Sequence, residues 1–384
     1  MRNDMSSIRI FQIFLFFLGA LLLLLAWEYR NFASLLMTVV VVLSLIVSFS
    51  SKVQSTLIPL ISVFAVLAVA DVALPVILSG SQELTQNDQT TGYASGGYYE
   101  RINGFGYRPN PGVYTHRKLT SEDDVIYDVV YTIGEDGYRN DIQTTDFAAY
   151  IYGGSFTFGE GLNDNETLSF YLLHNHGISS KNVGVHGYGM HQALYNIEQG
   201  LVPQRENVVN ILVTAPWHAL RSSCKPSYAA GTPKYELTEE GIYLNGVCAG
   251  RGFAQRVLRR SNVFQLVASL IEDINVITDS DINLYIEIIK EIARHTEENN
   301  SNLVIAYIDA TEEWLATTKW SNDSIIAELS NFATVLDVTL AETREKLDPR
   351  FYIHELDMHP SAIANEYRAA IIASHLENLE WSNE

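Results

Sequence analysis

Cysteine is nearly absent from this chain of 384 residues, which contains only Cys224 and Cys248. The sequence contains no Cys-x-x-Cys motif and no paired-histidine motif. It therefore predicts no metal site and suggests no cofactor. Both cysteines fall in one stretch rich in glycine, proline and tyrosine. In an oxidising compartment they would form a disulfide that closes this loop, and the alternative is two unpaired buried thiols.

Basic residues are also scarce, with 25 Lys and Arg against 45 Asp and Glu, a net charge of −20. A protein that binds nucleic acid needs a basic surface to neutralise phosphates, so this class of partner is excluded. The densest basic stretch, residues 254–260, resembles one face of a short helix. Such acidity suits a soluble, exported domain.

Long apolar runs are confined to the first eighty residues, where three occur at residues 10–27, 32–49 and 57–78. Each approaches the roughly 20 residues that cross a bilayer. A cleavable signal peptide is the alternative for the first run, but two further runs follow it at once and no cleavage site is evident. The sequence therefore predicts a three-span membrane anchor over residues 1–78.

The few charges around these runs suggest an orientation. Arg2 and Arg9 precede the first run and Lys52 lies between the second and third, and such residues favour the cytoplasmic side. Three crossings would then place the rest of the chain outside the cytoplasm, in the periplasm or beyond. Asp71, inside the third run, would be unfavourable at mid-membrane and needs hydration or a partner helix near its outer end.

The remainder of the chain alternates between strand and helix patterns. We expect a linker at 79–97, a small β-hairpin element at 98–146 with its turn at 134–137, and a catalytic domain at 147–384 with an insertion at about 215–260. Alternation predicts an α/β fold, a doubly wound parallel sheet with helices on both faces. The expected strands are 147–153, 181–186, 207–214, 302–309 and 350–354, and the expected helices are 166–176, 190–200, 262–277, 282–298 and 362–376.

A glycine-rich turn, Gly153-Gly154-Ser155, follows the first of these strands. A serine on such a turn presents its hydroxyl at the carboxyl end of the sheet, where open α/β folds place their sites. The glycines also expose backbone N–H groups that can bind a developing oxyanion. The alternative is a serine that merely caps the next segment.

A second motif lies about two hundred residues later, where Asp357 and His359 precede Pro360 and a C-terminal helix. A serine nucleophile needs a base near neutral pH, and the imidazole of that base needs an orienting carboxylate. Asp357 and His359 on one short loop supply both groups. Taken alone, the motif would be interpreted as a surface turn. It indicates a catalytic site only because the serine turn lies upstream in the same chain.

Together these motifs resemble the SGNH (GDSL) hydrolases over roughly residues 145–378. The turn at residues 153–159 resembles the nucleophile block, residues 182–189 the second block, and residues 357–360 the last block. The resemblance implies that Ser155 is the nucleophile, His359 the base, Asp357 its partner and Gly187 an oxyanion donor. It also implies a flavodoxin-like sheet.

The chain departs from the family at two positions. Gly154 replaces the aspartate that precedes the nucleophile. His218 stands where the oxyanion-binding asparagine of the third block is expected. A histidine N–H can also donate to an oxyanion; the alternative is that Trp217 and His218 only form the wall of the cleft.

The resulting hypothesis is a membrane-anchored, extracytoplasmic serine esterase that removes O-acyl groups, especially O-acetyl groups, from a cell-envelope or secreted glycan. An O-acyltransferase acting on the same glycans, together with the envelope polysaccharide machinery, is one alternative. A degenerate SGNH domain that binds glycans or assists assembly is the other. The expected location is the inner or plasma membrane, with the catalytic domain outside.

Overall fold

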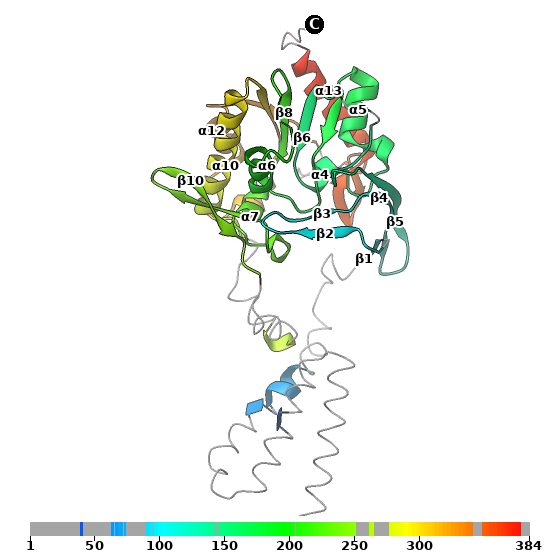
Figure 1. The fold of residues 1–384 in the computed structure, drawn as a ribbon. Helices are drawn as coiled ribbons and strands as arrows, with labels where there is room; N and C mark the ends of the chain where they lie inside the picture. The colour runs from blue at the N-terminus through cyan, green and yellow to red at the C-terminus, as the bar shows by residue number, and fades with distance from the viewer. Residues whose placement is uncertain are drawn as a thin grey trace, which may run out of the picture. The chain divides into compact units, whose positions relative to one another are not determined.

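The computed structural model describes residues 39–40, 63–64, 66–71, 73, 90–94, 96–142, 144, 146–203, 205–250, 261–264, 276–340 and 348–377 (Figure 1). The chain forms two compact units. One comprises Met1–Glu83 with Arg251–Asp273, and the other comprises Leu84–Gly250 with Ile274–Glu384. The segment Arg251–Asp273 therefore groups with the N-terminal unit, although it lies within the sequence of the catalytic domain. The predicted insertion thus continues past residue 260.

The predicted membrane spans lie almost wholly outside the described residues. Of the second run only residues 39–40 are described, and of the third run residues 63–64, 66–71 and 73. No helix in the described part of the chain is long and apolar enough to cross a membrane. The anchor stays a prediction.

Asp71, which lies within an apolar run, is hydrogen-bonded to residues 261–263. It is 1 % exposed, and its Oδ1 accepts from the Ser261 hydroxyl at 2.6 Å and from the Val263 backbone N–H at 3.0 Å. The Asn262 side chain donates to the Asp71 backbone oxygen at 2.8 Å. The start of a helix in the insertion thus satisfies the buried carboxylate, as a buried charge requires.

The second unit is built on a five-stranded parallel sheet. Its strands, in spatial order, are β7 (Ser180–Asn182), β6 (Ala149–Tyr152), β8 (Val209–Thr214), β11 (Asn302–Tyr307) and β12 (Thr334–Asp337). All neighbours pair in parallel. Numbered along the chain this is the order 2-1-3-4-5 of flavodoxin-like folds, in which the crevice lies between the first and third strands. The predicted parallel sheet is confirmed.

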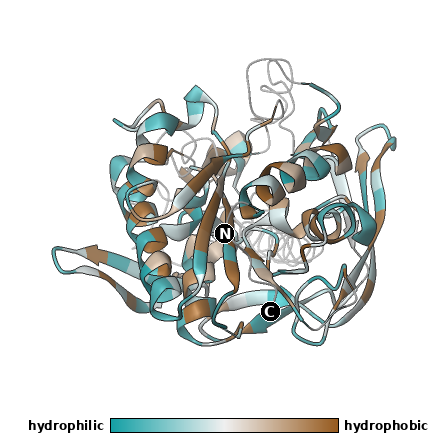
Figure 2. Cartoon of the chain, turned by 90° about the horizontal axis from the view of Figure 1, so that it is seen from above, coloured by the Kyte–Doolittle hydropathy of each residue, from teal (hydrophilic) through white to brown (hydrophobic). Residues whose placement is uncertain are grey.

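Helices cover both faces of this sheet (Figure 1). Side chains alternate across each strand, so Ile151 packs in the same cluster as Leu172 and Ile372, while Tyr150 packs in a second cluster with Leu194 and Ile289. The first cluster lies under α5 (Leu168–His176) and α13 (Ala362–Leu376), and the second under α6 (Met190–Glu198), α10 (Asp279–Glu298) and α12 (Asn322–Leu329). In Figure 2 the apolar strands lie between helices that carry hydrophilic residues on their outer sides.

The β element before the sheet is larger than predicted. Strands β1 (Thr90–Ala94), β4 (Gly112–Thr120) and β5 (Val125–Ile133) form one antiparallel sheet, and β2 (Tyr99–Ile102) pairs with β3 (Gly106–Pro109). The linker predicted to reach residue 97 is thus wrong at its end, because β1 pairs with β4.

The hairpin turn is also placed differently. The turn predicted at residues 134–137 forms, with the Gly137 N–H donating to the Gly134 oxygen, but only one bridge, between Ile133 and Arg139, accompanies it. The long hairpin is β4–β5 instead, closed at residues 121–124.

The last predicted strand does not join the parallel sheet. Strand β13 (Tyr352–His354) pairs with β14 (Asp357–Pro360) in an antiparallel hairpin. Two intervening residues are far too few for a crossover to a parallel neighbour. The prediction that residues 350–354 form a strand of the parallel sheet is therefore wrong: this strand belongs to a hairpin, and Asp357 and His359 lie on the other strand of that hairpin.

The insertion holds a further antiparallel hairpin, β9 (Pro233–Thr238) and β10 (Gly241–Val247), which the sequence analysis missed. The helix predicted at 262–277 does not reach its expected end, because residues 276–278 are not helical and Thr278 caps α10. The remaining short elements are η2 (Asp164–Glu166), η3 (Ser227–Ala229), α4 (Ser155–Phe158), α7 (His218–Ser222) and α11 (Glu312–Leu315).

Candidate active site

Ser155 lies directly beyond the carboxyl end of β6, as the first residue of α4. The chain can make this bend only with glycine at position 153, where a Cβ would lie 2.1 Å from Thr157 Oγ1 and 2.7 Å from the Val213 oxygen. The side chain of Ser155 is held in a buried turn, with the residue 6 % exposed.

His359 and Asp357 meet this serine. Ser155 Oγ lies 2.9 Å from Nε2 of His359, and Nδ1 of the same ring lies 2.5 Å from Oδ1 of Asp357. Phe156 packs edge-on against the imidazole, with ring centroids 5.6 Å apart. The structure thus brings together the three residues that the motifs singled out, in the arrangement by which an imidazole takes a proton from serine while a carboxylate orients it.

Lys118, on β4, contacts this constellation from the β element. Its Nζ lies 2.9 Å from Oδ2 of Asp357, which is the carboxylate oxygen that His359 does not use. Burial alone would raise the pKa of Asp357, but the hydrogen bond from His359 and the charges of His359 and Lys118 hold that pKa below its usual value. Asp357 is therefore a carboxylate at neutral pH. Lys118 could not be identified from the sequence, because an isolated lysine carries no local signal of such a contact.

A second carboxylate, Glu160, lies on the other side of the base. Its Oε2 is 3.4 Å from Nε2 of His359 and 2.7 Å from Nδ1 of His186, whose Nε2 lies 3.1 Å from the Tyr98 hydroxyl. Burial opposes its charge, but His359 and His186 hold its pKa well below the usual range.

Both carboxylates affect the pKa of His359. Burial alone would lower the pKa of His359, yet the charges of Glu160 and Asp357 outweigh burial and raise that pKa above its usual value. His186 reaches the site through Glu160. Glu160 itself lies in the glycine-rich nucleophile block, at Gly159-Glu160-Gly161, and that position was its only sequence signal.

His218 is the first residue of α7, which follows β8. It is 5 % exposed, and burial, together with the charge of Arg221, lowers the pKa of its imidazole well below its usual value. It is therefore neutral and carries one ring hydrogen. Its Nδ1 lies 3.0 Å from the Thr214 hydroxyl, which lies 2.9 Å from the Tyr285 hydroxyl.

The hydrogen bonds that link Tyr285, Thr214 and His218 determine the tautomer of His218. Thr214 and Tyr285 are 1 % and 0 % exposed, and among the described residues their hydroxyls have only these two contacts. If Tyr285 donates to Thr214 and Thr214 donates to Nδ1, both contacts and both hydroxyl hydrogens are satisfied. A hydrogen on Nδ1 would leave one buried hydroxyl without an acceptor, which is unfavourable. His218 therefore carries its hydrogen on Nε2.

That Nε2–H faces the nucleophile turn. A Cβ on Gly154, the residue before Ser155, would lie 3.2 Å from Nε2 of His218. Ser155 and His218 also line one small cavity of about 10 Å³, together with Phe156, Val213, Thr214, Ala215, Trp217, Arg221 and Ile308. A volume of this size accommodates about one water-sized group.

Gly154 replaces the expected aspartate for a structural reason. A Cβ at this position would lie 2.5 Å from Nη1 of Arg221 and 3.1 Å from the Tyr188 oxygen. The place of the family's carboxylate is thus occupied by a guanidinium. Arg221 belongs to the stretch that ends the third block, but the sequence analysis gave it no role.

Gly187 adopts a left-handed conformation, with φ +73°, where a Cβ would meet the Tyr107 hydroxyl at 2.6 Å. The next residue, Tyr188, accepts a hydrogen bond from Arg221 at 2.9 Å, so the second block lies against the nucleophile turn. Gly187 is not among the residues that line the cavity beside Ser155. Its role as an oxyanion donor stays a prediction.

The predicted disulfide between Cys224 and Cys248 is confirmed. It ties Cys224, two residues after the end of α7, to Cys248, directly after β10, with the two Cα atoms 5.4 Å apart. The helix that carries His218 is therefore fixed at its carboxyl end by a covalent link.

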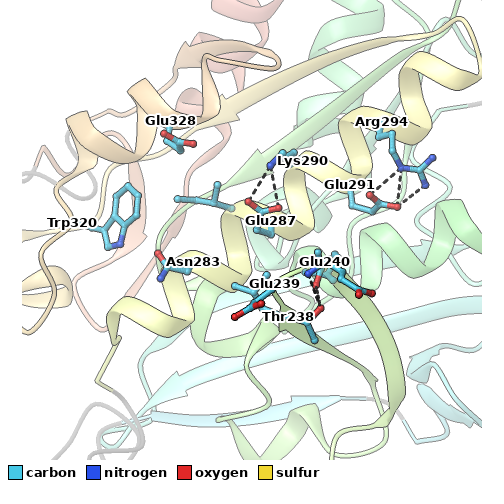
Figure 3. Close-up of a pocket in the computed structure, with 14 residues that line it drawn as sticks. Thr238, Glu239, Glu240, Asn283, Glu287, Lys290, Glu291, Arg294, Trp320 and Glu328 are labelled. Carbon is cyan, nitrogen blue, oxygen red and sulfur yellow. Dashed lines mark hydrogen bonds and ion pairs between the residues drawn. The ribbon is translucent and has the colours of Figure 1, made fainter.

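A larger groove, of about 700 Å³, lies between the β9–β10 hairpin and α10 (Figure 3). Its two basic side chains are already paired with carboxylates of the same helix, Lys290 with Glu287 and Arg294 with Glu291. Beside it, Glu198, Glu291 and His295 approach one another closely, but Tyr235 donates to Glu198 and Arg294 to Glu291. The groove contains no serine or cysteine nucleophile, so the chemistry belongs at Ser155.

Comparisons with known proteins show similarity of fold alone. No family model matches the chain, and no curated protein does. Among solved structures, a protein assigned to the lipolytic G-D-S-L family from Desulfitobacterium hafniense has 12 % identity and a TM-score of 0.34, covering 59 % of this chain and 98 % of that one. An acetyl xylan esterase from Butyrivibrio proteoclasticus has 10 % identity and a TM-score of 0.33, covering 69 % and 74 %. At such scores these likenesses say nothing about activity.

Proposed function

We propose that this protein is a serine esterase that removes O-acyl groups, especially acetyl groups, from a cell-envelope or secreted glycan. The observation that carries this proposal is the contact of Ser155 Oγ with Nε2 of His359 at 2.9 Å, with Asp357 on the opposite ring nitrogen. This arrangement activates a hydroxyl for attack on an ester carbonyl.

The reaction proceeds in two stages. In acylation, Ser155 Oγ forms a bond to the ester carbonyl carbon, its proton passes to Nε2 of His359, and the carbonyl π electrons move to the oxygen. When the carbonyl re-forms, the bond to the sugar oxygen breaks, and that oxygen takes the proton from His359. In deacylation, water repeats these steps and releases acetate, with Ser155 as the leaving group.

The negative charge that forms on the carbonyl oxygen needs donors. The Nε2–H of His218 faces the cavity beside Ser155, and the backbone N–H groups of Ser155 and Gly187 are the donors that the family resemblance implies. His218 and Ser155 are preorganised, because both residues are buried where α7 and the glycine turn begin.

Exposed aromatic rings near the site support a sugar substrate. Tyr228 is 45 % exposed, and its ring lies 3.1 Å from the Cβ position of Gly187. Tyr99 is 46 % exposed and packs against His186. Large, partly exposed rings of this kind suit packing against the apolar face of a sugar.

The apolar runs at residues 10–27, 32–49 and 57–78 support membrane attachment with the catalytic unit outside the cytoplasm. In the described part of the third run, Val63, Val66 and Val69 are 54 %, 67 % and 64 % exposed, which suits an apolar surrounding. The disulfide agrees with an oxidising compartment. Envelope glycans are the acylated polymers that such an enzyme would meet.

The test uses the full chain in detergent with an activated acetyl ester. Wild type should turn the ester over, whereas Ser155→Ala and His359→Ala should lose nearly all activity. The exposed Ser280, changed to alanine, is the matched control and should keep wild-type activity. If Ser155→Ala keeps wild-type turnover, the assignment is wrong.

A second assay supplies an O-acetylated glycan with and without an unacetylated acceptor sugar. Release of free acetate supports the esterase. Transfer of the acetyl group to the acceptor would identify the O-acyltransferase instead, because the two reactions share one acyl-enzyme and differ only in the nucleophile that resolves it. No acyl-enzyme with any acyl ester would indicate the glycan-binding alternative.

A further inference from the structure

We propose that Arg221 is a catalytic residue that binds the oxyanion, in the space that Gly154 leaves open beside the nucleophile. This inference rests on the proposed esterase function and goes beyond it, because it assigns the charged contact of the oxyanion site to a residue for which the family resemblance implies no role.

The position of Arg221 is fixed by two contacts. Its Nη1 lies 2.5 Å from the point where a Cβ of residue 154 would lie, one residue before Ser155. The same nitrogen donates to the Tyr188 oxygen at 2.9 Å. Arg221 also lines the small cavity that Ser155 and His218 line. The guanidinium is therefore held at the nucleophile.

Its charge is not neutralised by a carboxylate. Within the described part of the chain, no Asp or Glu forms an ion pair with Arg221. The carboxylates of the site, Asp357 and Glu160, lie around His359 instead. The positive charge of Arg221 lowers the pKa values of both His218 and His191, so its field reaches the cavity.

Ser155 thus lies between carboxylates on the side of His359 and the positive charge of Arg221 on the other side. The side of His359 is anionic and favours the imidazolium that forms when serine loses its proton. The side of Arg221 is cationic and favours the negative charge that forms on the carbonyl oxygen. The transition state, with an imidazolium at His359 and an oxyanion near Arg221, is therefore stabilised by the charges on both sides.

The size of the cavity decides what Arg221 binds. A volume of about 10 Å³ admits one oxygen atom but not a substrate carboxylate with its two oxygens. The guanidinium has five N–H donors, and one of the two at Nη1 is used on Tyr188, so several remain. As Ser155 Oγ bonds to the carbonyl carbon, the π electrons move to the oxygen, which accepts from Arg221 and from the Nε2–H of His218. No proton leaves Arg221, since guanidinium stays charged in proteins.

The test compares Arg221→Gln and Arg221→Lys with wild type on a neutral acetyl ester. Arg221→Gln should lower kcat by roughly 10² to 10³, as loss of one oxyanion donor does, with KM little changed. Arg221→Lys keeps the charge and should recover part of the rate. Arg294→Gln, on the exposed face of α10, is the matched control and should leave kcat unchanged.

Chemical rescue separates catalysis from folding. Millimolar guanidinium should restore activity to Arg221→Ala by at least tenfold and should not affect Arg294→Gln, because only the former has a cavity shaped for the ion. The melting temperatures of all variants are compared, so that loss of structure is recognised. A normal kcat in Arg221→Gln, a rise in KM alone, or a loss that guanidinium leaves uncorrected in a folded protein would each overturn the proposal.

Labelling by a fluorophosphonate distinguishes this proposal from the proposed function. In this reaction Ser155 Oγ bonds to phosphorus, fluoride leaves, and the serine proton passes to His359. Wild type should label at Ser155, and Arg221→Gln should label at least tenfold more slowly. Equal labelling rates would reject the role of Arg221 and leave the esterase standing. If wild type neither labels nor hydrolyses esters, the esterase proposal is wrong and Arg221 loses its role with it.

Discussion

Lys118 Nζ lies 2.9 Å from Oδ2 of Asp357, although 239 residues separate the two in sequence. Asp357 uses its other oxygen on His359, so both oxygens of this buried carboxylate have a partner. Lys118 belongs to β4, in the β element that precedes the parallel sheet. This element is therefore part of the active site, and a catalytic domain that began at residue 147 would lack it.

Removing this lysine should change the pH dependence of catalysis. The positive charge of Lys118 lowers the pKa of His359, so Lys118→Met should raise that pKa. Since the base must be neutral to accept the serine proton, the acidic limb of kcat/KM should move to higher pH. Arg117→Met, which removes an exposed cation from the same strand, is the control. A limb that stays in place would show that Lys118 only packs against Asp357.

The Glu160→Gln variant should produce the opposite shift. The charge of Glu160 raises the pKa of His359, so removing that charge should lower the pKa. The acidic limb of kcat/KM should then move to lower pH, and the rate below neutrality should increase. Glu240→Gln, on the exposed turn of the β9–β10 hairpin, is the control. A shift in the same direction as in Lys118→Met would contradict the electrostatic account of this site.

Much of the site could be predicted from the sequence because its chemistry is concentrated in short motifs. Ser155 follows an apolar strand, and Asp357 and His359 are two residues apart, so these motifs and their resemblance to the SGNH hydrolases singled out all three. Strands β6, β8 and β11 are buried on both faces and read as continuous apolar runs.

The parts of the site and of the fold that could not be predicted depend on contacts between distant segments. Lys118 and Arg221 acquire their roles only through tertiary packing, and a single lysine or arginine has no distinguishing neighbourhood in sequence. Strand β12 is half exposed at the edge of the sheet, so its pattern Thr334-Val-Leu-Asp337 lacks the apolar character of the central strands. The β13–β14 hairpin was assigned to the parallel sheet because a short apolar run does not reveal its pairing partner.

The disulfide should contribute measurably to stability. Cys224 and Cys248 are 24 residues apart, and closing a loop of this size stabilises the folded state by about 3 kcal/mol in the chain-entropy model. The free energy of unfolding of Cys224→Ser/Cys248→Ser, measured in urea, should fall by about this amount. In native wild type a thiol reagent should label neither cysteine until reductant is added. Rapid labelling before reduction would remove this support for an exterior location.

The tautomer of His218 can be measured directly. The hydrogen count around Thr214 and Tyr285 predicts a neutral imidazole protonated on Nε2, which ¹⁵N NMR distinguishes from the Nδ1–H form; the signal is assigned by its loss in His218→Asn. His218→Ala should lower kcat by roughly 10² to 10³ with little change in KM. His218→Asn, which restores the family's residue type, should recover part of that loss.

The partner of His218 allows a finer comparison. Thr214→Val removes the donor to Nδ1 and should lower kcat by about tenfold, whereas Thr214→Ser retains the hydroxyl and should keep most activity. Tyr285→Phe leaves the bond from Thr214 to Nδ1 intact and should have the smaller effect. A wild-type ring protonated on Nδ1, or a His218→Ala variant that raises only KM, would make His218 a wall of the cleft.

Gly154→Ala tests the space that Arg221 occupies. The added methyl would lie 2.5 Å from Nη1 of Arg221, which is the mobile end of a long side chain, and 3.1 Å from the Tyr188 oxygen. The guanidinium should therefore move away while the fold persists, so the melting temperature should change little. If Arg221 binds the oxyanion, kcat should nonetheless fall by at least tenfold. Combining Gly154→Ala with Arg221→Gln should then cost little beyond Arg221→Gln alone, because both changes remove the same contact. Fully additive losses would show that Gly154 affects the rate by another route.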